Sequence, residues 1–258
     1  MTTVVCMKWG TLYGPEYVNR LHAGVRRYLA RPFRFVCFTD DAQGLDEGVE
    51  AQPLPGTGSA ETVDTRWRKL AIFRPGLAGL SGPVLFLDLD LVIVGDLAPF
   101  FDLPGRFYVI RDAELFPARW SRRLFRPARE RFYQTVGNTS VFRFEAGQHA
   151  DLLERFNREH AQVIARYRNE QEYLSAHLHA QGALRFWPRG WCASFKHDCV
   201  PHPLLSHFRA PRCPAGAKMV VFAGRPKMAE VLAGQGGRWY RRIGPAPWFV
   251  KAWTGQST

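Results

Sequence analysis

The segment "PVLFLDLDLVIVGDL", residues 83–97, places two aspartates, Asp88 and Asp90, inside an otherwise apolar run. Moving an ionised carboxylate out of water costs several kcal/mol even after relaxation, so two carboxylates of like charge require a positive partner. Side chains at positions i and i+2 of a strand point to the same face, and a strand here would bring the two carboxylates together. Two oxygen donors on one side form half of a divalent metal site. In the competing interpretation, one Asp caps a turn and the other pairs with a surface arginine.

Strand and helix patterns alternate along the chain, which is typical of a sheet covered by helices on both faces. We expect strands over residues 3–9, 33–40, 83–90, 106–112 and 218–224. We expect helices over 15–29, 65–73, 148–167 and 170–181. With 258 residues and 46% hydrophobic content, the chain can bury a sizeable core. We therefore predict one α/β domain over residues 1–235 and a less regular tail over 236–258.

Charge and hydropathy limit the partners. Lys and Arg exceed Asp and Glu by 35 to 23, a net charge of +12 that favours phosphate-bearing ligands. The tail mixes Arg238, Arg241 and Arg242 with several aromatic residues, so we predict a peripheral contact with an anionic membrane. No apolar stretch approaches the roughly 18 residues of a membrane span, and the N-terminus lacks a signal-peptide pattern. The five cysteines include no C-x-x-C pair, and we expect a reduced, cytoplasmic protein.

Several segments together resemble a known family. "FLDLDLVIVGDL" is similar to the Asp-x-Asp motif of GT-A glycosyltransferases, in particular those of glycosyltransferase family 8. The other matching segments follow in the family's order: "VVCMKWGTLYGPEYVNRL" (4–21), "RWRKLAIF" (66–73), "GNTSVFRF" (137–144), "NEQEYL" (169–174) and "FAGRPKM" (222–228). The resemblance implies a GT-A, Rossmann-like mixed sheet flanked by helices. It also implies transfer of a sugar from a UDP-sugar to a hydroxyl of a surface glycan or glycolipid, with retention of anomeric configuration.

The resemblance also implies site residues. Asp88 and Asp90 would hold Mn²⁺ or Mg²⁺, and the segment after the first strand would enclose the uridine with Lys8, Trp9, Gly10 and Tyr13. Arg66 and Lys69 would face the donor, Asn138, Thr139 and Ser140 would form a turn at the donor sugar, and Glu170 and Gln171 would act beside Asp90 in catalysis. Gly224 and Lys227 would bind phosphate. We add Lys196, in the aromatic "WCASFKH" (191–197), as a further binding candidate, and this segment fits either an acceptor pocket or a packed corner.

These residue types fit the chemistry independently of the family. A nucleoside diphosphate carries about two to three negative charges, which a divalent cation bridges to carboxylates while lysines neutralise the outer oxygens. Asn138, Ser140 and Gln171 can form hydrogen bonds with sugar hydroxyls. For each of these residues a bland interpretation stays open: Asn138 as a turn residue, Lys69 and Lys227 as solvated surface charges, and 170–172 as the polar first turn of a helix.

The sequence departs from the family at Ala223, where a histidine metal ligand is usual, and at Met228 and Ala229, where Pro-Trp is usual. A third protein ligand is therefore in doubt. His202 or His207 could substitute, or the diphosphate and water could complete the metal shell. A separate zinc site formed by Cys192, His197, Cys199 and His202 would need irregular spacing.

Two other classes remain open on the sequence alone. "FLDLDLV" also fits haloacid dehalogenase-like phosphatases, with Asp88 as nucleophile and Asp90 as general acid, although about 87 residues precede the motif and no downstream acidic pair follows. The segment 111–131 carries seven arginines against three acids and could make the chain a non-enzymatic nucleic-acid-binding protein. Because that segment holds no recognition motif, we expect no nucleic-acid partner.

Overall fold

A central seven-stranded sheet organises the computed structural model, which describes residues 2–58, 65–117, 132–237 and 239–255. The strand order is β3-β2-β1-β4-β7-β6-β8. The strands are β1 (Thr2–Lys8), β2 (Phe33–Thr39), β3 (Glu50–Pro53), β4 (Pro83–Leu87), β6 (Phe107–Arg111), β7 (Gly137–Glu145) and β8 (Leu184–Phe186). Strands β1 to β4 pair in parallel, whereas β7 runs antiparallel between β4 and β6. The predicted mixed α/β sheet is confirmed.

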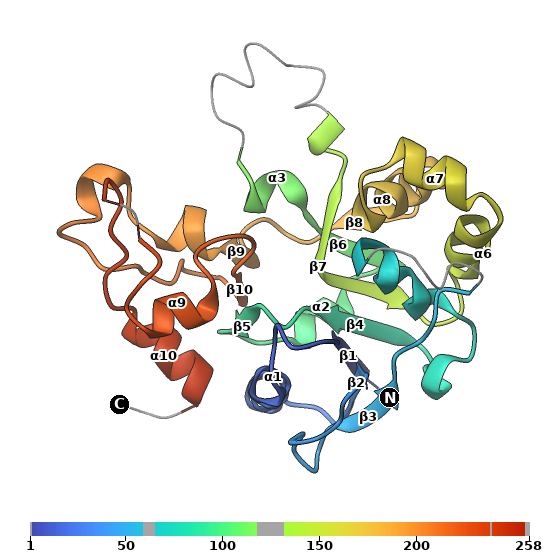
Figure 1. Ribbon diagram of the computed structural model, residues 1–258, viewed down its shortest axis with the longest axis horizontal. Helices are drawn as coiled ribbons and strands as arrows, with labels where there is room; N and C mark the ends of the chain where they lie inside the picture. The colour runs from blue at the N-terminus through green and yellow to red at the C-terminus, as the bar shows by residue number, and fades with distance from the viewer. Residues whose placement is uncertain (1, 59–64, 118–131, 238, 256–258) are drawn as a thin grey trace.

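Both faces of this sheet are covered, as Figure 1 shows. Alternate residues of the central strands point to opposite faces, so Val4 and Cys6 belong to one hydrophobic core and Val5 and Met7 to the other. The first core packs against α1 (Pro15–Tyr28) and α2 (Ala98–Asp102). The second packs against the 3₁₀ helix η1 (Thr65–Phe73) and the helices α6 (Ala150–Arg158), α7 (His160–Arg166) and α8 (Glu170–Ala180).

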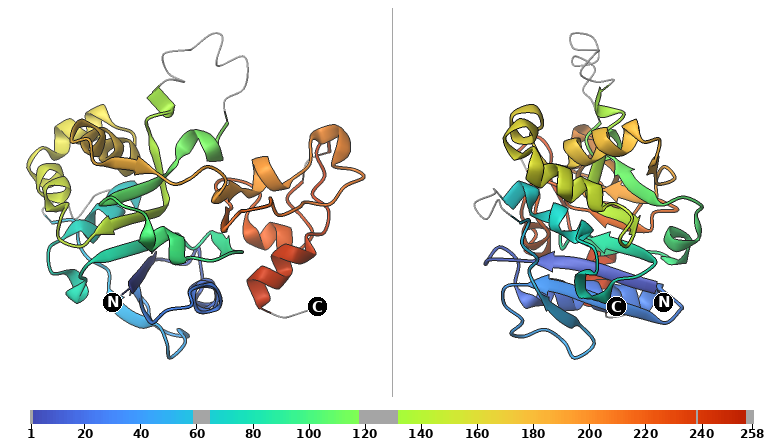
Figure 2. Two further views of the ribbon diagram at one scale, coloured as in Figure 1. Left: turned by 180° about the vertical axis from the view of Figure 1, so that it is seen from behind. Right: turned by 90° about the vertical axis from the view of Figure 1, so that its right-hand side faces the viewer.

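A second sheet carries the C-terminal part of the chain to one side of the first (Figure 2). Its central strand β10 (Met219–Val221) pairs antiparallel with β5 (Leu91–Ile93) and parallel with β9 (Cys192–Ser194). A third core lies beneath it and includes Phe195, Phe222 and Phe249. The remaining short elements are η2 (Leu77–Gly79), α3 (Asp112–Leu115), η3 (Phe195–Cys199), η4 (Pro203–Leu205), α9 (Met228–Leu232) and α10 (Pro247–Thr254).

The tail predicted to begin at residue 236 contributes to this third core. Helix α10 lies within it, Phe249 is fully buried, and the Trp248 indole donates a hydrogen bond to the Pro211 carbonyl. Trp253 packs edge-on against Tyr17 of α1. Trp248, Phe249 and Trp253 therefore pack against other parts of the protein instead of projecting as a membrane-binding surface. The domain boundary at 236 stays a prediction.

Three local predictions were wrong. The strand through 83–90 ends at Leu87, because the chain leaves the first sheet there and enters the second at Leu91. Residues 138–140 lie inside strand β7 instead of on a turn, because they pair with β6 and with the end of β4. The single helix over 148–167 is two helices, α6 and α7, separated at Glu159, whose ψ of 27° departs from helical geometry.

Candidate active site

A cavity of about 270 Å³ lies at the carboxyl ends of β1 and β4. Because these strands are parallel and adjacent, the residues that follow them meet at one edge of the sheet, where open α/β sheets bind ligands. The first residues of η1 and of α8 complete the wall. Eight predicted residues line it: Lys8, Trp9, Tyr13, Arg66, Lys69, Asp88, Asp90 and Glu170.

Asp88 is held between the two neighbouring elements. Its backbone N–H donates to the Ser140 carbonyl of β7 at 2.8 Å, and its carboxylate contacts the Lys69 ammonium at 2.7–2.8 Å. Lys69 also donates to the Thr139 carbonyl at 3.1 Å. Burial alone would lower the pKa of Lys69, but the carboxylates of Asp88 and Glu170 raise it instead. The positive partner required by the sequence is thus Lys69, which stays charged, and its interpretation as a solvated helix residue is wrong.

Asp90 lies where the two sheets meet. Its carbonyl accepts a hydrogen bond from the Phe222 N–H at 2.8 Å, which ties it to the residue that follows β10. Its carboxylate lies 3.8 Å from the Lys227 ammonium. Burial, followed by repulsion from Asp88, raises the pKa of Asp90 to about 6. The two carboxylates therefore repel one another across the cavity, as two ligands of one cation do before the cation binds.

Glu170 begins helix α8, where the Asn169 side chain caps the helix by accepting from the Glu172 N–H at 3.1 Å. The Glu170 carboxylate accepts a hydrogen bond from the Thr139 hydroxyl at 2.6 Å. Burial raises the pKa of Glu170, while the Lys69 charge acts in the opposite direction. Glu170 and Asp88 thus share Lys69 as their nearest cation, and Glu170 is more than the polar first turn of a helix.

The segment that follows β1 supplies the opposite wall. Lys8 is buried and donates to the Asp41 carbonyl at 3.1 Å. The Trp9 ring lies 5.4 Å from the Arg68 guanidinium, a cation–π distance. Burial, with a further effect of Asp90 and Asp88, raises the pKa of the Tyr13 phenol, which therefore stays protonated at neutral pH. This wall offers an aromatic surface and a hydroxyl donor.

The two carboxylates of Asp88 and Asp90 suit a divalent cation as ligands. Asp88 and Asp90 supply hard oxygen ligands beside an open volume. Burial first, and then repulsion from Asp88, raises the pKa of Asp90, and a bound cation would offset both effects. Within the described parts of the chain, no three His, Cys, Asp or Glu side chains gather as a metal-binding group. Cys192, His197, Cys199 and His202 therefore do not form the zinc site considered above, and His202 and His207 do not join the two aspartates. The remaining ligands of a cation at Asp88 and Asp90 would have to come from substrate and water.

Seven predicted residues do not line the cavity: Gly10, Asn138, Ser140, Gln171, Lys196, Gly224 and Lys227. Asn138 is buried, and its side chain contacts Asp112 at 3.2 Å and the Ser140 N–H at 3.1 Å, which removes both residues from the surface. The Gly10 N–H donates to Asp40 at 2.8 Å. Lys227 reaches the site only through Asp90. Lys196 lines a different cavity, described below.

Sequence reasoning missed four lining residues, Met7, Leu12, Thr65 and Leu89. Met7 precedes Lys8, and Leu89 lies between Asp88 and Asp90, so adjacency to predicted residues was the available signal. Sequence reasoning also treated Thr139 only as part of a turn. In the structure its carbonyl accepts from Lys69 and its hydroxyl donates to Glu170, so Thr139 connects the two side chains. No local pattern marks that role, because it depends on β7 lying between β4 and α8.

Comparisons with known proteins identify the architecture. No protein-family model matches the chain, and no curated protein sequence matches it. Among solved structures, the glycosyltransferase GlyE of Streptococcus pneumoniae TIGR4 superposes with a TM-score of 0.57 at 14% identity, over 88% of this chain and 56% of GlyE. The chain thus spans little more than half the length of GlyE.

The galactosyltransferase LgtC, in complex with donor and acceptor sugar analogs, superposes with a TM-score of 0.54 at 12% identity, over 87% of this chain and 88% of LgtC. An active-site mutant of LgtC gives the same TM-score at 10% identity. At these identities the likeness concerns the fold. The chain therefore has the GT-A fold of these glycosyltransferases.

Proposed function

We propose that this protein is a glycosyltransferase that moves a sugar from a UDP-sugar to a hydroxyl group of a glycan or glycolipid. The observation that carries the proposal is the pair Asp88 and Asp90, each with a lysine beside it, at the rim of a cavity on the ligand-binding edge of a GT-A fold. The structures of GlyE and LgtC belong to glycosyltransferases, and LgtC holds donor and acceptor analogs. That likeness supports the reaction class.

The chain's own charges suit a bound diphosphate. Asp88 and Asp90 would hold Mn²⁺ or Mg²⁺, and the ion would supply positive charge to the diphosphate oxygens when bound. Lys69, Lys227 and Arg66 would neutralise the outer oxygens. Trp9 and Tyr13 would enclose the base, since both aromatic residues line the cavity. Gly224, beside Lys227, would let the diphosphate approach the backbone.

Transfer breaks the bond between the anomeric carbon and the diphosphate oxygen, and the electron pair leaves with that oxygen. The acceptor oxygen forms the new bond from the same face and gives its proton to the departing diphosphate, which yields retention. Lys69 and Lys227 stabilise the charge that develops on the leaving group. Glu170, whose carboxylate accepts a hydrogen bond from the Thr139 hydroxyl, would orient the sugar together with Gln171, the next residue of α8. An inverted anomeric centre in the product, observed by NMR, would refute this mechanism.

We also propose a peripheral membrane contact, on a surface that keeps Trp239 of the predicted tail but not the tail's packed aromatic residues. Trp248 and Phe249 are packed in the third core, whereas Leu204, Phe208 and Trp239 are 77%, 87% and 90% exposed. Arg209 follows Phe208 in the chain and is also exposed, so a basic group accompanies an exposed apolar one, as an anionic bilayer requires. None of the described helices has the length and hydropathy of a membrane span. Flotation with anionic liposomes should be lost when Phe208 and Trp239 are both changed to Ser, and unchanged flotation would refute the contact.

The test of the donor site is isothermal titration of UDP into the full chain with Mn²⁺, with EDTA, and after Asp88→Asn with Asp90→Asn. We expect binding that needs both the metal and the two carboxylates. Asp102→Asn is the matched control, because Asp102 forms an exposed ion pair with Arg31 outside the cavity. A wild-type chain that fails to bind UDP with Mn²⁺ would overturn the proposal.

The two other classes lose support. A haloacid dehalogenase-like phosphatase requires a different fold, and Asp88 as nucleophile would have to attack from within its ion pair with Lys69. The arginine-rich segment 111–131 lies outside the described residues from 118 onward. No observation in the described part of the chain favours a nucleic-acid ligand.

A further inference from the structure

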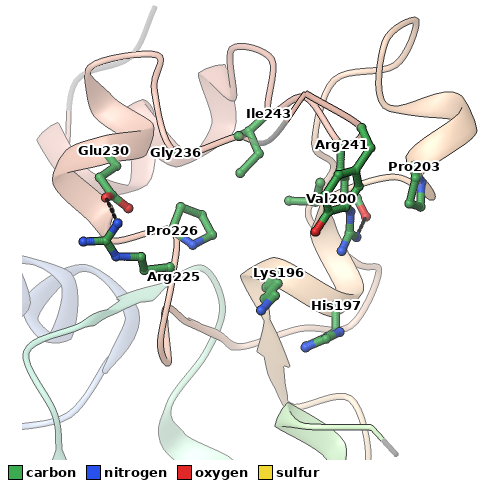
Figure 3. Close-up of a pocket in the computed structure, with 12 residues that line it drawn as sticks. Lys196, His197, Val200, Pro203, Arg225, Pro226, Glu230, Gly236, Arg241 and Ile243 are labelled. Carbon is green, nitrogen blue, oxygen red and sulfur yellow. Dashed lines mark hydrogen bonds and ion pairs between the residues drawn. The ribbon is translucent and has the colours of Figure 1, made fainter. Parts of the chain in front are cut away.

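A second cavity, of about 530 Å³, lies in the C-terminal part of the chain. Its volume is within the range of small-molecule sites, about 300–1,000 Å³. Figure 3 shows that Lys196 and His197 approach it from one side, Arg225 and Glu230 from a second, and Arg241 from a third. The Tyr240 residue also lines it. Three permanent cations thus face one volume with one acid.

The single acid does not neutralise the cavity. The Glu230 carboxylate already accepts a hydrogen bond from the Lys227 N–H at 2.7 Å and lies 3.8 Å from the Arg225 guanidinium. Lys196, in contrast, makes no hydrogen bond or ion pair with any residue that the structure describes. Residues 199–258 as a whole contain nine Lys or Arg and one acid. The cavity therefore retains a positive charge of about +2, which an anion would balance.

The cations are fixed by local structure. Arg241 donates to the Val200 carbonyl at 2.7 Å and to the Pro201 carbonyl at 3.1 Å, which holds its guanidinium at the wall. Lys196 and His197 lie on η3, a single π-helical turn, an uncommon geometry that is frequent at functional sites. Burial, followed by the charges of Lys196 and Arg241, lowers the pKa of His197, which agrees with the three groups lying close together.

Strand register brings this cavity near the donor site, although the two cavities share no lining residue. Val221 pairs with Leu91 on one side and with Ser194 on the other, so the ends of β10 and β9 lie beside the carboxylate segment. Lys196 follows Ser194 by two residues, and Asp90 precedes Leu91. Neighbouring strands are about 4.8 Å apart, which places the entry to η3 about 10 Å from the Asp90 backbone. A ligand in this cavity can therefore extend to the donor site.

We infer that this cavity is the acceptor subsite and binds a phosphate group carried by the acceptor. The inference rests on the proposed function, because it supplies the second substrate of that reaction. A phosphate monoester carries about −1.5 to −2 at pH 7, which matches the uncompensated charge of the cavity. Planar Arg241 suits two phosphate oxygens, and Lys196 supplies a point charge. The phosphate belongs either to a polyprenyl lipid or to a soluble phosphorylated glycan.

The test is isothermal titration of inorganic phosphate into the full chain, with UDP and Mn²⁺ present so that the donor cavity is filled. We expect Lys196→Gln with Arg241→Gln to weaken phosphate binding about tenfold or more. Arg212→Gln with Arg242→Gln is the matched control, since it removes the same charge from exposed positions outside the cavity. Equal phosphate affinity of the two double variants would overturn the inference.

Arg241 also holds the backbone at 200–201, so its replacement could disturb the local structure. Lys196→Glu, at an exposed position, is a second variant that leaves Arg241 in place. It should weaken phosphate binding by a similar factor. UDP binding is recorded in the same experiment. If the wild-type chain does not bind UDP, both the acceptor role and the proposed function are overturned. Normal UDP binding without phosphate binding would overturn the subsite alone.

Vesicle flotation distinguishes the two sources of phosphate. Phosphatidylcholine vesicles that contain polyprenyl phosphate should float the chain through Lys196 and Arg241 if the acceptor is lipid-linked. Phosphate binding without such flotation indicates a soluble phosphorylated acceptor, and either result supports the subsite. Vesicles of phosphatidylglycerol present only phosphodiesters. If they float the chain equally well through the same two residues, the assignment of a phosphate monoester is overturned.

Discussion

The two cavities differ in how their charges are balanced. In the donor cavity the charged groups are already paired within the protein, Asp88 with Lys69 at 2.7 Å and Asp90 near Lys227 at 3.8 Å. In the second cavity Lys196 has no such partner among the described residues, and the one acid, Glu230, already lies beside Arg225 and accepts from the Lys227 N–H. A balanced site suits a cation and an anion that bind together, whereas an unbalanced site suits an anion alone. The predictions below test this difference, in order of decreasing effect.

The largest effect should follow removal of both donor carboxylates. Asp88→Asn with Asp90→Asn should lower the rate of sugar transfer by about 10³-fold, because the ligands of the metal ion are lost. The measurement is the initial rate with a UDP-sugar and Mn²⁺. A loss of less than about tenfold, or an equal loss in Asp102→Asn, would show that the carboxylates do not hold the reacting group.

Removing Lys69 should destabilise the protein as well as the site. Lys69→Met leaves Asp88 without its cation, and the two side chains are only 15% and 24% exposed. We expect the free energy of unfolding to fall by about 2 kcal/mol, measured by urea denaturation. A double-mutant cycle with Asp88→Asn checks the cause, since the second substitution should add little once the first is present. Fully additive effects would contradict a direct pair.

A third protein ligand should bring the donor site closer to a preformed metal site. Ala223 follows Phe222, whose N–H donates to the Asp90 carbonyl, so Ala223→His places an imidazole near the carboxylates. We expect Mn²⁺ to bind the nucleotide-free protein about tenfold more tightly, measured by titration of Mn²⁺ alone. Ala229→His is the control on the same segment. An unchanged affinity in Ala223→His would mean that residue 223 does not face the ion.

The smallest effect concerns the hydroxyl that joins the two sides of the donor cavity. Thr139→Val removes the hydrogen bond to Glu170 and keeps the shape of the side chain. We expect a loss of about 1 kcal/mol in the free energy of unfolding, because the buried carboxylate loses a donor. The double variant Thr139→Val with Glu170→Gln should regain part of the lost free energy of unfolding. A variant as stable as the wild type would remove Thr139 from the network.

The sequence was informative where burial is local and uninformative where strands pair over long distances. Strand β1 and helix α1 were predicted because their residues alternate or repeat in a single pattern. The cost of a buried charge predicted a cation against Asp88, but only the structure identifies that cation as Lys69. The sequence could not predict that Asp88 and Asp90 lie after the end of β4. The apolar run 83–97 looks like one strand, but within it the chain passes from the first sheet to the second, and the second sheet depends on pairing with β10. For the same reason the sequence left two interpretations of Lys196 open, an acceptor pocket and a packed corner, and the role of Lys196 stays a prediction.

The contact between β5 and β10 has a consequence for how the protein forms. Leu91 pairs with Val221, so the position of Asp90 is set by a segment synthesised much later. Contacts between residues far apart in sequence are slow to close, because the intervening chain must first be ordered. During synthesis, β1 to β4 can assemble while the second carboxylate still lacks its final backbone partner. Under the proposed function, a nascent chain that ends before β10 would therefore lack a competent metal site, and the sugar donor could not bind before the proposed acceptor side has been made.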